Sequence, residues 1–122
     1  MSKDGKFDLE ERLIAYAIRI LRVANALPRT STGNHIRGQL TRSGTSAAPN
    51  YGEAQSAESR ADFVHKIKVV LKELRESRVW LLIIQRAELI KPAVQLNDII
   101  QETNELIAIF VKSAKTAARN QA

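Results

Sequence analysis

The sequence predicts an all-α protein that folds as an antiparallel, up-down-up-down four-helix bundle. Four segments carry apolar residues at steps of three and four, which is the spacing of one helix face. Short connections join these segments, and short connections place consecutive helices antiparallel. No segment alternates with a period of two over enough residues to suggest a strand. The 122 residues fit a single domain, and an aromatic content of 5% suits helices packed on helices.

The first helix is predicted over about residues 8–27. Acidic residues near its start suit the positive end of the helix dipole, and Pro28 stops it after its last apolar position. The predicted inner face of this helix is formed by Leu9, Leu13, Tyr16, Ala17, Ile20, Leu21, Ala24 and Leu27.

The second helix is predicted over about residues 33–57. Its apolar spacing continues through "SGTSAAPN", residues 43–50, where the side chains become small. Small residues let another backbone approach closely, so we expect a tight helix contact there. Pro49 lacks a backbone N–H and its ring clashes with the preceding turn, so we also expect a kink near Pro49.

The third helix is predicted over about residues 60–89. Ser59 and Asp62 open it with the spacing S-x-x-D, an acidic and weaker form of the capping box. The fourth helix is predicted over about 93–118, directly after Pro92, because proline is favoured in the first turn of a helix. The whole chain is therefore expected to form one bundle domain.

Several classes of function find no support in the sequence. The chain has no Cys, which excludes disulfides and thiolate metal sites. It has no G-x-S-x-G or P-loop motif, so we expect no enzyme and no cofactor. The N-terminal residues lack the apolar run of a signal peptide, and the longest apolar run is too short to span a membrane. We therefore expect a cytoplasmic protein without a membrane partner.

The charge of the chain favours an anionic partner, most naturally RNA or DNA. Lys and Arg number 19 against 13 Asp and Glu, a net charge of +6. The candidate phosphate-binding residues are Arg12, Arg19, Arg22, Lys68, Lys72, Arg75, Arg78, Lys112, Lys115 and Arg119.

By helical spacing, Lys68, Lys72 and Arg75 share one face, and we place the three C-terminal cations on another. A solvated helix surface is the alternative reading. Few aromatics accompany these charges, so contact with the phosphate backbone is expected rather than base stacking.

Polar residues near the inner faces of the second and third helices form a predicted polar layer. Its members are Ser43, Asn50, Glu53, Glu73, Glu76 and Ser77. They could form an acid/base or metal cluster, but we expect a hydrogen-bonded layer that fixes register, because buried polar groups are usually satisfied structurally. Asp62 and His65 form one D-x-x-H pair, whereas a di-iron bundle needs two, and His35 has no acidic partner at that spacing. We therefore expect no metal site.

The apolar run "VWLLII", residues 79–84, predicts a protein contact. One helix face cannot bury six consecutive apolar side chains, so members of the set Val79, Trp80, Leu82 and Ile83 must face outward. Exposed apolar patches usually mark an interface, although insertion under a flanking loop is an alternative. We expect self-association, since symmetric homo-oligomers are common among soluble chains.

The stretch "QLTRSGTSAAPNYGEA", residues 39–54, resembles the second helix of the four helix bundle proteins, also called 23S ribosomal RNA intervening-sequence proteins. The residues that match the family pattern are Gln39, Arg42, Ser43, Ser46, Asn50 and Glu53, followed by Asp62, Phe63 and Glu73 or Glu76. The resemblance covers about residues 8–118. It implies a left-handed antiparallel bundle and, as in relatives, a ring-shaped homopentamer.

One branch similar in fold comprises the accessory variability proteins of diversity-generating retroelements. That branch works with a reverse transcriptase and nucleic acid, so the resemblance implies these partners as well.

Two hypotheses for function result. The first is a non-enzymatic, homo-oligomeric adaptor that binds RNA or DNA by charge. The second is an oligomeric protein-interaction scaffold whose positive charge is incidental. A metal-dependent bundle enzyme ranks below both.

Overall fold

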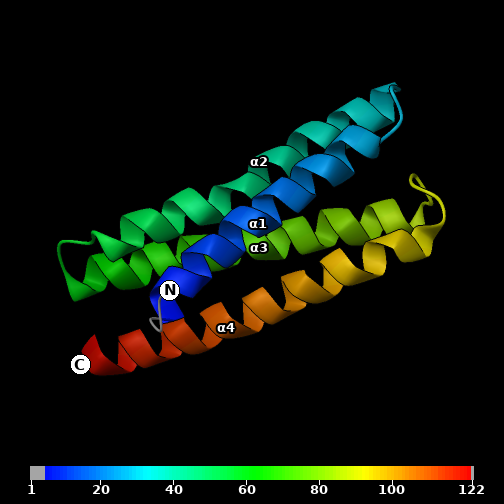
Figure 1. The fold of residues 1–122 in the computed structure, drawn as a ribbon. Helices are drawn as coiled ribbons and strands as arrows, with labels where there is room; N and C mark the ends of the chain where they lie inside the picture. The colour runs from blue at the N-terminus through cyan, green and yellow to red at the C-terminus, as the bar shows by residue number, and fades with distance from the viewer. Residues whose placement is uncertain (1–4, 122) are drawn as a thin grey trace.

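A computed structural model of the chain describes residues 5–121, and the side chains of residues 9–119. Its elements, in order, are α1 (Gly5–Ala26), α2 (Ser31–Gln55), α3 (Arg60–Arg86), the 3-10 turn η1 (Ala93–Leu96) and α4 (Asn97–Gln121). Figure 1 shows consecutive helices running in opposite directions, and the described part of the chain has no strand. The predicted all-α antiparallel four-helix bundle is confirmed.

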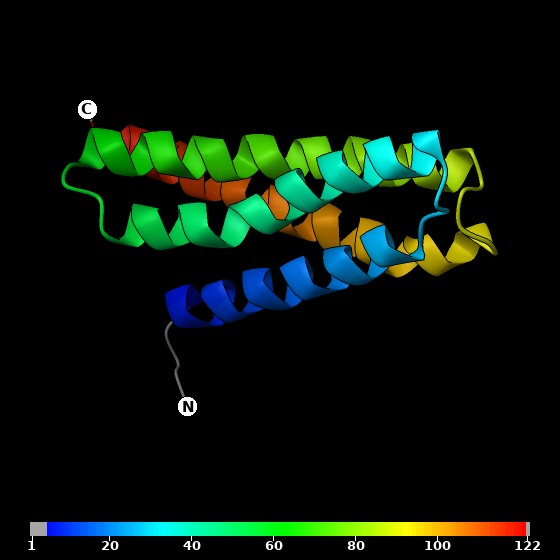
Figure 2. The same cartoon turned by 90° about the horizontal axis from the view of Figure 1, so that it is seen from above.

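The helices are arranged around the core in chain order. α1 packs on α2, α2 on α3 and α3 on α4, whereas α1 and α4 meet at few positions. Figure 2 shows α1 turning away from the other helices toward its N-terminal end. The outer surface between α1 and α2 therefore lies on the opposite side of the bundle from the outer surface between α3 and α4. We call these two surfaces the α1–α2 face and the α3–α4 face.

Local capping interactions set where the helices begin and end. α2 begins at Ser31 rather than near 33 because Thr30 caps it, with Oγ1 accepting a hydrogen bond from the Gly33 amide at 3.0 Å. Ser59 caps α3 as predicted and accepts from the Asp62 amide at 3.0 Å.

The connection between α3 and α4 differs from the prediction. α3 ends at Arg86 rather than near 89, and Glu88 just beyond it has a φ of 54°, a left-handed conformation common after helix ends. The next segment begins as the 3-10 turn and becomes α-helical only at Asn97.

The small residues of α2 lie where α1 and α2 approach each other. A Cβ added to Gly44 would lie 2.4 Å from Cγ2 of Ile20 on α1, so only glycine fits without movement. Ala47, one turn further on, is 1% exposed. α2 continues as one helix through Pro49, which is exposed, and Figure 2 shows that α2 bends along its length.

Candidate nucleic-acid interface

A groove on the α3–α4 face brings together cations from two helices. Its lining consists of four cationic and three apolar side chains: Lys68, Leu71, Lys72, Arg75, Val111, Ala114 and Lys115. We call this the basic groove. Three of its cations come from α3, where steps of four and three residues hold them on one face, and Lys115 comes from α4. The apolar residues lie between the helices and hold the two walls together.

The structure divides the second predicted group of cations. Lys115 lines the basic groove, whereas Lys112 lines a different groove beside Arg60 and Phe63. A step of three residues offsets two side chains by about 60° around the helix, and the boundary between the two grooves runs between Lys112 and Lys115. Arg119 is exposed and lines neither groove.

The cations of the basic groove have no ion-pair partner among the side chains that the structure describes, those of residues 9–119. Their charge therefore remains available to an anion. The apolar floor between them has a low dielectric constant, which concentrates their electrostatic field in the groove.

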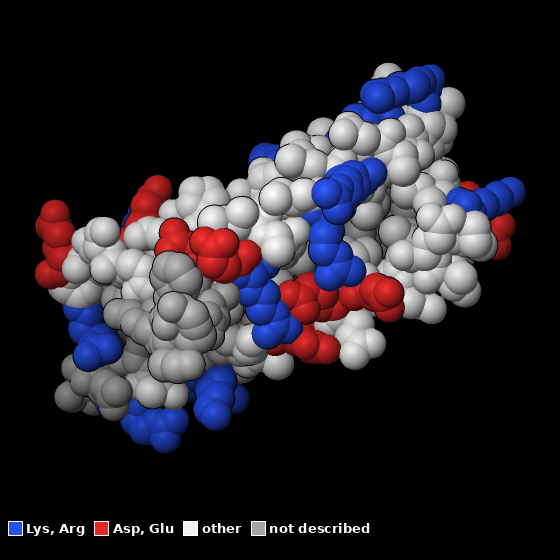
Figure 3. Space-filling view, in the orientation of Figure 1, with Lys and Arg blue, Asp and Glu red and all other residues white. Residues whose placement is uncertain are grey.

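Other candidate cations are engaged elsewhere. Arg12 on α1 donates to Glu102 and Glu105 of α4, each at 2.8 Å, and these contacts raise the pKa of its guanidinium further above the ordinary value. Arg78 donates to the Asn104 side chain at 2.9 Å. Figure 3 shows the side of the molecule that carries α1, where basic and acidic side chains adjoin.

Arg19 and Arg22 also lie on α1, away from the basic groove, and Arg22 is exposed. Charge and spacing alone could not separate these residues from the groove cations, because which helices lie side by side is a property of the fold.

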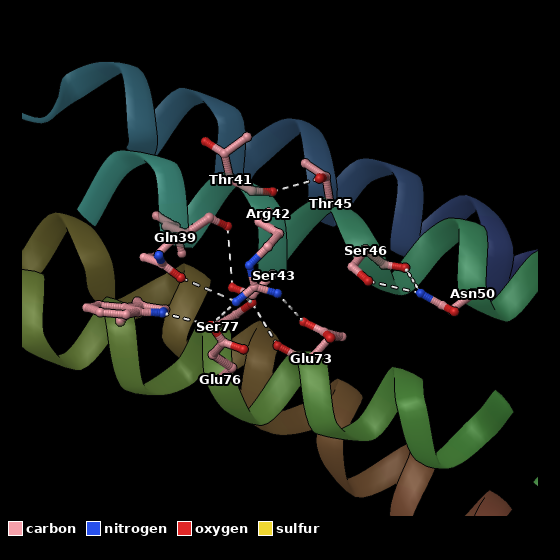
Figure 4. Close-up of polar contacts among 12 residues, drawn as sticks. Gln39, Thr41, Arg42, Ser43, Thr45, Ser46, Asn50, Glu73, Glu76 and Ser77 are labelled. Atoms are coloured by element: carbon pink, nitrogen blue, oxygen red, sulfur yellow. Dashed lines mark hydrogen bonds and ion pairs between the residues drawn. The ribbon is translucent and has the colours of Figure 1, made fainter. Parts of the chain in front are cut away.

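Two members of the predicted polar layer are buried, Ser43 and Ser77, each 0% exposed. Their hydroxyl oxygens lie 2.9 Å apart between α2 and α3 (Figure 4). The sequence missed the matching pair on the other helices, in which the Tyr16 hydroxyl of α1 lies 2.7 Å from Thr103 Oγ1 of α4. Burial raises the pKa of Tyr16 to about 12. One hydroxyl from each helix thus contributes to a buried polar layer.

The other predicted members lie outside this layer. Glu73 and Glu76 sit at the surface between α2 and α3 and both pair with Arg42, the first at 3.2 Å (Figure 4). Glu53 is exposed and accepts from Lys66 at 2.7 Å. Asn50 donates to the Ser46 carbonyl of its own helix at 2.9 Å. The carboxylates therefore serve as ion-pair partners between helices and do not converge on a shared point.

The described residues contain no group of three His, Asp or Glu that could hold a metal ion. Asp62 stands at the N-terminus of α3 next to its cap, and His65 is exposed.

An apolar patch continues the α3–α4 face beyond the basic groove. Val79 is 51% exposed and Ile83 is 40% exposed, and with the half-buried Leu82 they line a shallow depression bordered by Arg86. We call Val79, Leu82 and Ile83 the apolar patch. The patch and the basic groove occupy successive turns of one face of α3, which the sequence did not reveal as a single surface.

Trp80 does not belong to the patch. Its side chain turns toward α2, where it meets His35 edge-on at a ring distance of 5.9 Å. Its Nε1–H donates to Glu76 at 3.2 Å. The helix rotates by about 100° per residue, so Trp80 points to a different side of α3 from Val79.

A second exposed apolar surface lies on α1 and was not predicted. Ile14, Ile18 and Leu21 are 39%, 44% and 40% exposed, and their spacing places them on one side of the helix. We call these residues the α1 stripe. Leu21 was expected on the inner face, but it lies to one side of the buried positions Ile20 and Ala24.

None of the helices between residues 5 and 121 is long and apolar enough to cross a membrane.

Comparison with known proteins gives two findings. A family model described as 23S rRNA-intervening sequence protein matches residues 6–112. The crystal structure of a protein of unknown function from the S23 ribosomal protein family of Bacteroides thetaiotaomicron is similar, with a TM-score of 0.82 and 29% sequence identity. The similarity covers 92% of this chain and 99% of that one. Comparison with curated proteins gives no significant match.

Proposed function

The chain belongs to the 23S rRNA-intervening sequence protein family, as its sequence predicted, and from this premise we propose a function. The protein is a non-enzymatic, homo-oligomeric bundle that binds RNA or DNA through the basic groove. The observation that carries this proposal is the convergence of four cations from two helices on one groove, without an ion-pair partner among the described side chains.

The chemistry of the basic groove favours the phosphate backbone over the bases. Each phosphate that meets a lysine or arginine releases condensed counterions, which supplies affinity without reading sequence. The groove lining contains no aromatic side chain on which a base could stack. Little sequence preference is therefore expected.

The polar groups of the bundle support a binding role rather than catalysis. The four hydroxyls of the polar layer are each at most 1% exposed, out of reach of a substrate. Glu53, Glu73 and Glu76 are occupied by ion pairs. Neither the buried hydroxyls nor these paired carboxylates offer the free, exposed group that nucleophilic or acid/base catalysis uses.

Fluorescence anisotropy with labelled single- and double-stranded RNA and DNA of unrelated sequences tests the proposal. The logarithm of affinity should fall linearly with the logarithm of salt between about 50 and 200 mM. Replacing Lys68, Lys72 and Arg75 together by Gln should weaken binding to every sequence alike and flatten this slope.

The matched control removes three exposed cations away from the groove, Arg22, Arg29 and Lys91, again by replacement with Gln. It changes the net charge by the same amount and should leave the slope nearly unchanged. Equal effects of the two triple variants would mean that net charge, not the groove, binds the polyanion. Absence of binding at about 50 mM salt, where such contacts are strong, would leave the scaffold hypothesis.

The scaffold alternative has one observation in its favour, the exposed apolar patch beside the basic groove. Protein partners remain part of the proposal. The family resemblance implies a ring of five copies, and its retroelement branch implies a reverse transcriptase as a further partner. A gene next to a reverse transcriptase gene would favour the second partner.

A further inference from the structure

A hollow at one end of the bundle differs in chemistry from the basic groove. It lies between the start of α3 and the second half of α4 and has a volume of about 410 Å³. Its polar and aromatic lining consists of two cations, one ring and two hydroxyls: Arg60, Phe63, Lys112, Ser113 and Thr116. Apolar side chains of α4 complete the floor. We call this the Phe63 hollow.

The Phe63 hollow is separate from the basic groove. Lys112 lines the hollow and Lys115 lines the groove, so the two sites lie on different flanks of α4. Figure 2 shows that α1 turns away from the other helices at this end of the bundle, and no described side chain of α1 lines the hollow. A ligand can therefore reach the hollow without contacting the basic groove.

The cations of the hollow are available to an anion. Neither Arg60 nor Lys112 has an ion-pair partner among the described side chains. Arg119 is exposed and follows Lys112 by two helical turns, so it stands on the same side of α4 and adds positive charge near the rim.

The acids nearest in sequence are directed elsewhere. No described acid lines the hollow. At the start of α3, Oδ2 of Asp62 accepts a hydrogen bond from the Glu58 amide at 3.4 Å, and the Glu58 side chain is exposed. On α4 the preceding acid, Glu105, accepts from Arg12 at 2.8 Å. The local charge is therefore positive and favours an anionic ligand.

Phe63 supplies what the basic groove lacks, an aromatic ring for a base. The side chain is half-buried, and together with Arg60 it also lines a second depression beside the end of α2. The ring thus borders open space on two sides. Stacking on an aromatic ring holds a base with little preference among the four, and a planar guanidinium one turn away can bind a phosphate through two N–H groups.

The remaining features suit the same ligand. The hydroxyls of Ser113 and Thr116 can donate to or accept from the polar atoms of a sugar or a base. The volume of the hollow, about 410 Å³, lies within the range of sites for small organic ligands, roughly 300–1,000 Å³.

From these observations we infer that the Phe63 hollow binds a nucleotide, with its base stacked on the Phe63 ring and its phosphate between Arg60 and Lys112. A free nucleoside monophosphate and the phosphorylated end of a strand share this chemistry. The inference goes beyond the proposed function, because it adds a second site that contacts a base and does not need the basic groove.

Isothermal titration calorimetry with adenosine monophosphate, ribose phosphate and adenosine separates the contact with the base from the contact with the phosphate. The nucleotide should bind about tenfold more tightly than either fragment, because each fragment lacks one of the two contacts. Phe63→Leu keeps an apolar side chain against the core and should remove the advantage of the nucleotide over ribose phosphate. Phe63→Tyr keeps the ring and should retain that advantage.

Replacing Arg60 and Lys112 together by Gln should bring the affinity for the nucleotide close to that for adenosine. The matched control replaces Arg86 and Lys91, two exposed cations at the opposite end of the bundle, and should bind the nucleotide as the unmodified protein does. Circular dichroism checks that all variants keep their helical content.

Short single strands with and without a terminal phosphate distinguish the two sources of the ligand. A gain from the phosphate that Phe63→Leu abolishes assigns the site to strand ends, whereas a gain seen only with adenosine monophosphate assigns it to free nucleotides. Equal binding of the nucleotide and ribose phosphate, with no gain from a terminal phosphate, would overturn the inference, and so would a gain that Phe63→Leu leaves intact. The variant with Gln at positions 68, 72 and 75 should still bind the nucleotide, so failure of the basic groove and failure of the hollow are told apart.

Discussion

At the scale of single residues, Tyr16 ties protonation to folding. Its pKa is raised from about 10 to about 12 because burial disfavours the phenolate, and the hydrogen bonds with Thr103 and Ser77 offset this only in part. The folded protein therefore holds this proton more tightly than the unfolded chain does. The stability that results is fully present below about pH 10 and is lost as the pH rises through about 12.

Comparison with Tyr16→Phe isolates this contribution. The difference in unfolding free energy between the unmodified protein and the variant should shrink by about 1.4 kcal/mol from pH 8 to pH 11, from the shift in pKa. Urea unfolding at both pH values measures it. Other groups titrate equally in both proteins, so a difference that stays constant would contradict the burial of the Tyr16 hydroxyl.

Trp80 shows what a residue-level prediction from sequence cannot decide. An apolar run on a helix establishes that some side chains face outward, but the phase of the helix decides which. Val79 and Ile83 are exposed as expected. Trp80 follows Val79 in the helix and is turned by about 100° from it, so its side chain faces His35 and Glu76 instead.

At the scale of elements, α2 contains glycines with opposite consequences for packing. Gly44 faces α1, where a Cβ would lie 2.4 Å from Ile20, and Gly38 faces open space. Gly44→Ala should therefore destabilise the bundle by about 1–3 kcal/mol through overpacking. Gly38→Ala should stabilise it by about 0.4–1 kcal/mol by restricting the unfolded chain.

The two substitutions make the same chemical change in one helix, so each is the control for the other. Urea unfolding of the two variants and of the unmodified protein measures both changes. Equal shifts for the two variants would mean that the close approach of α1 and α2 is not at Gly44.

The helices themselves were predictable because their signals are local. Apolar spacing, Ser59 as a cap and Pro28 as a stop all act within a few residues, and the helices lie where these signals place them, to within a few residues at the ends. The 3-10 start of the last segment and the left-handed Glu88 were not predictable in the same way, because the geometry of the connection between α3 and α4 depends on how the two helices pack.

At the scale of the whole molecule, the candidate site depends on packing between distant segments. Lys68, Lys72 and Arg75 could be grouped from their spacing alone, because they share one helix. Lys115 joins them only because α3 and α4 pack with these faces together, and Arg12 leaves the set only because α4 brings it two carboxylates. Charge is visible in a sequence, but the pairing of charges is a property of the fold.

Assembly and binding are expected to reinforce each other. A ring presents one basic groove per copy, so a long strand that reaches several grooves should bind far more tightly than a short one, on the order of a hundredfold, because later contacts become intramolecular. A strand too short to reach a second groove should not show this gain.

Anisotropy titrations with a short and a long labelled single strand of the same composition measure the effect. Equal affinity for the two strands, counted per bound site, would mean that one groove accounts for all the binding. Avidity across the ring would then contribute nothing to the affinity.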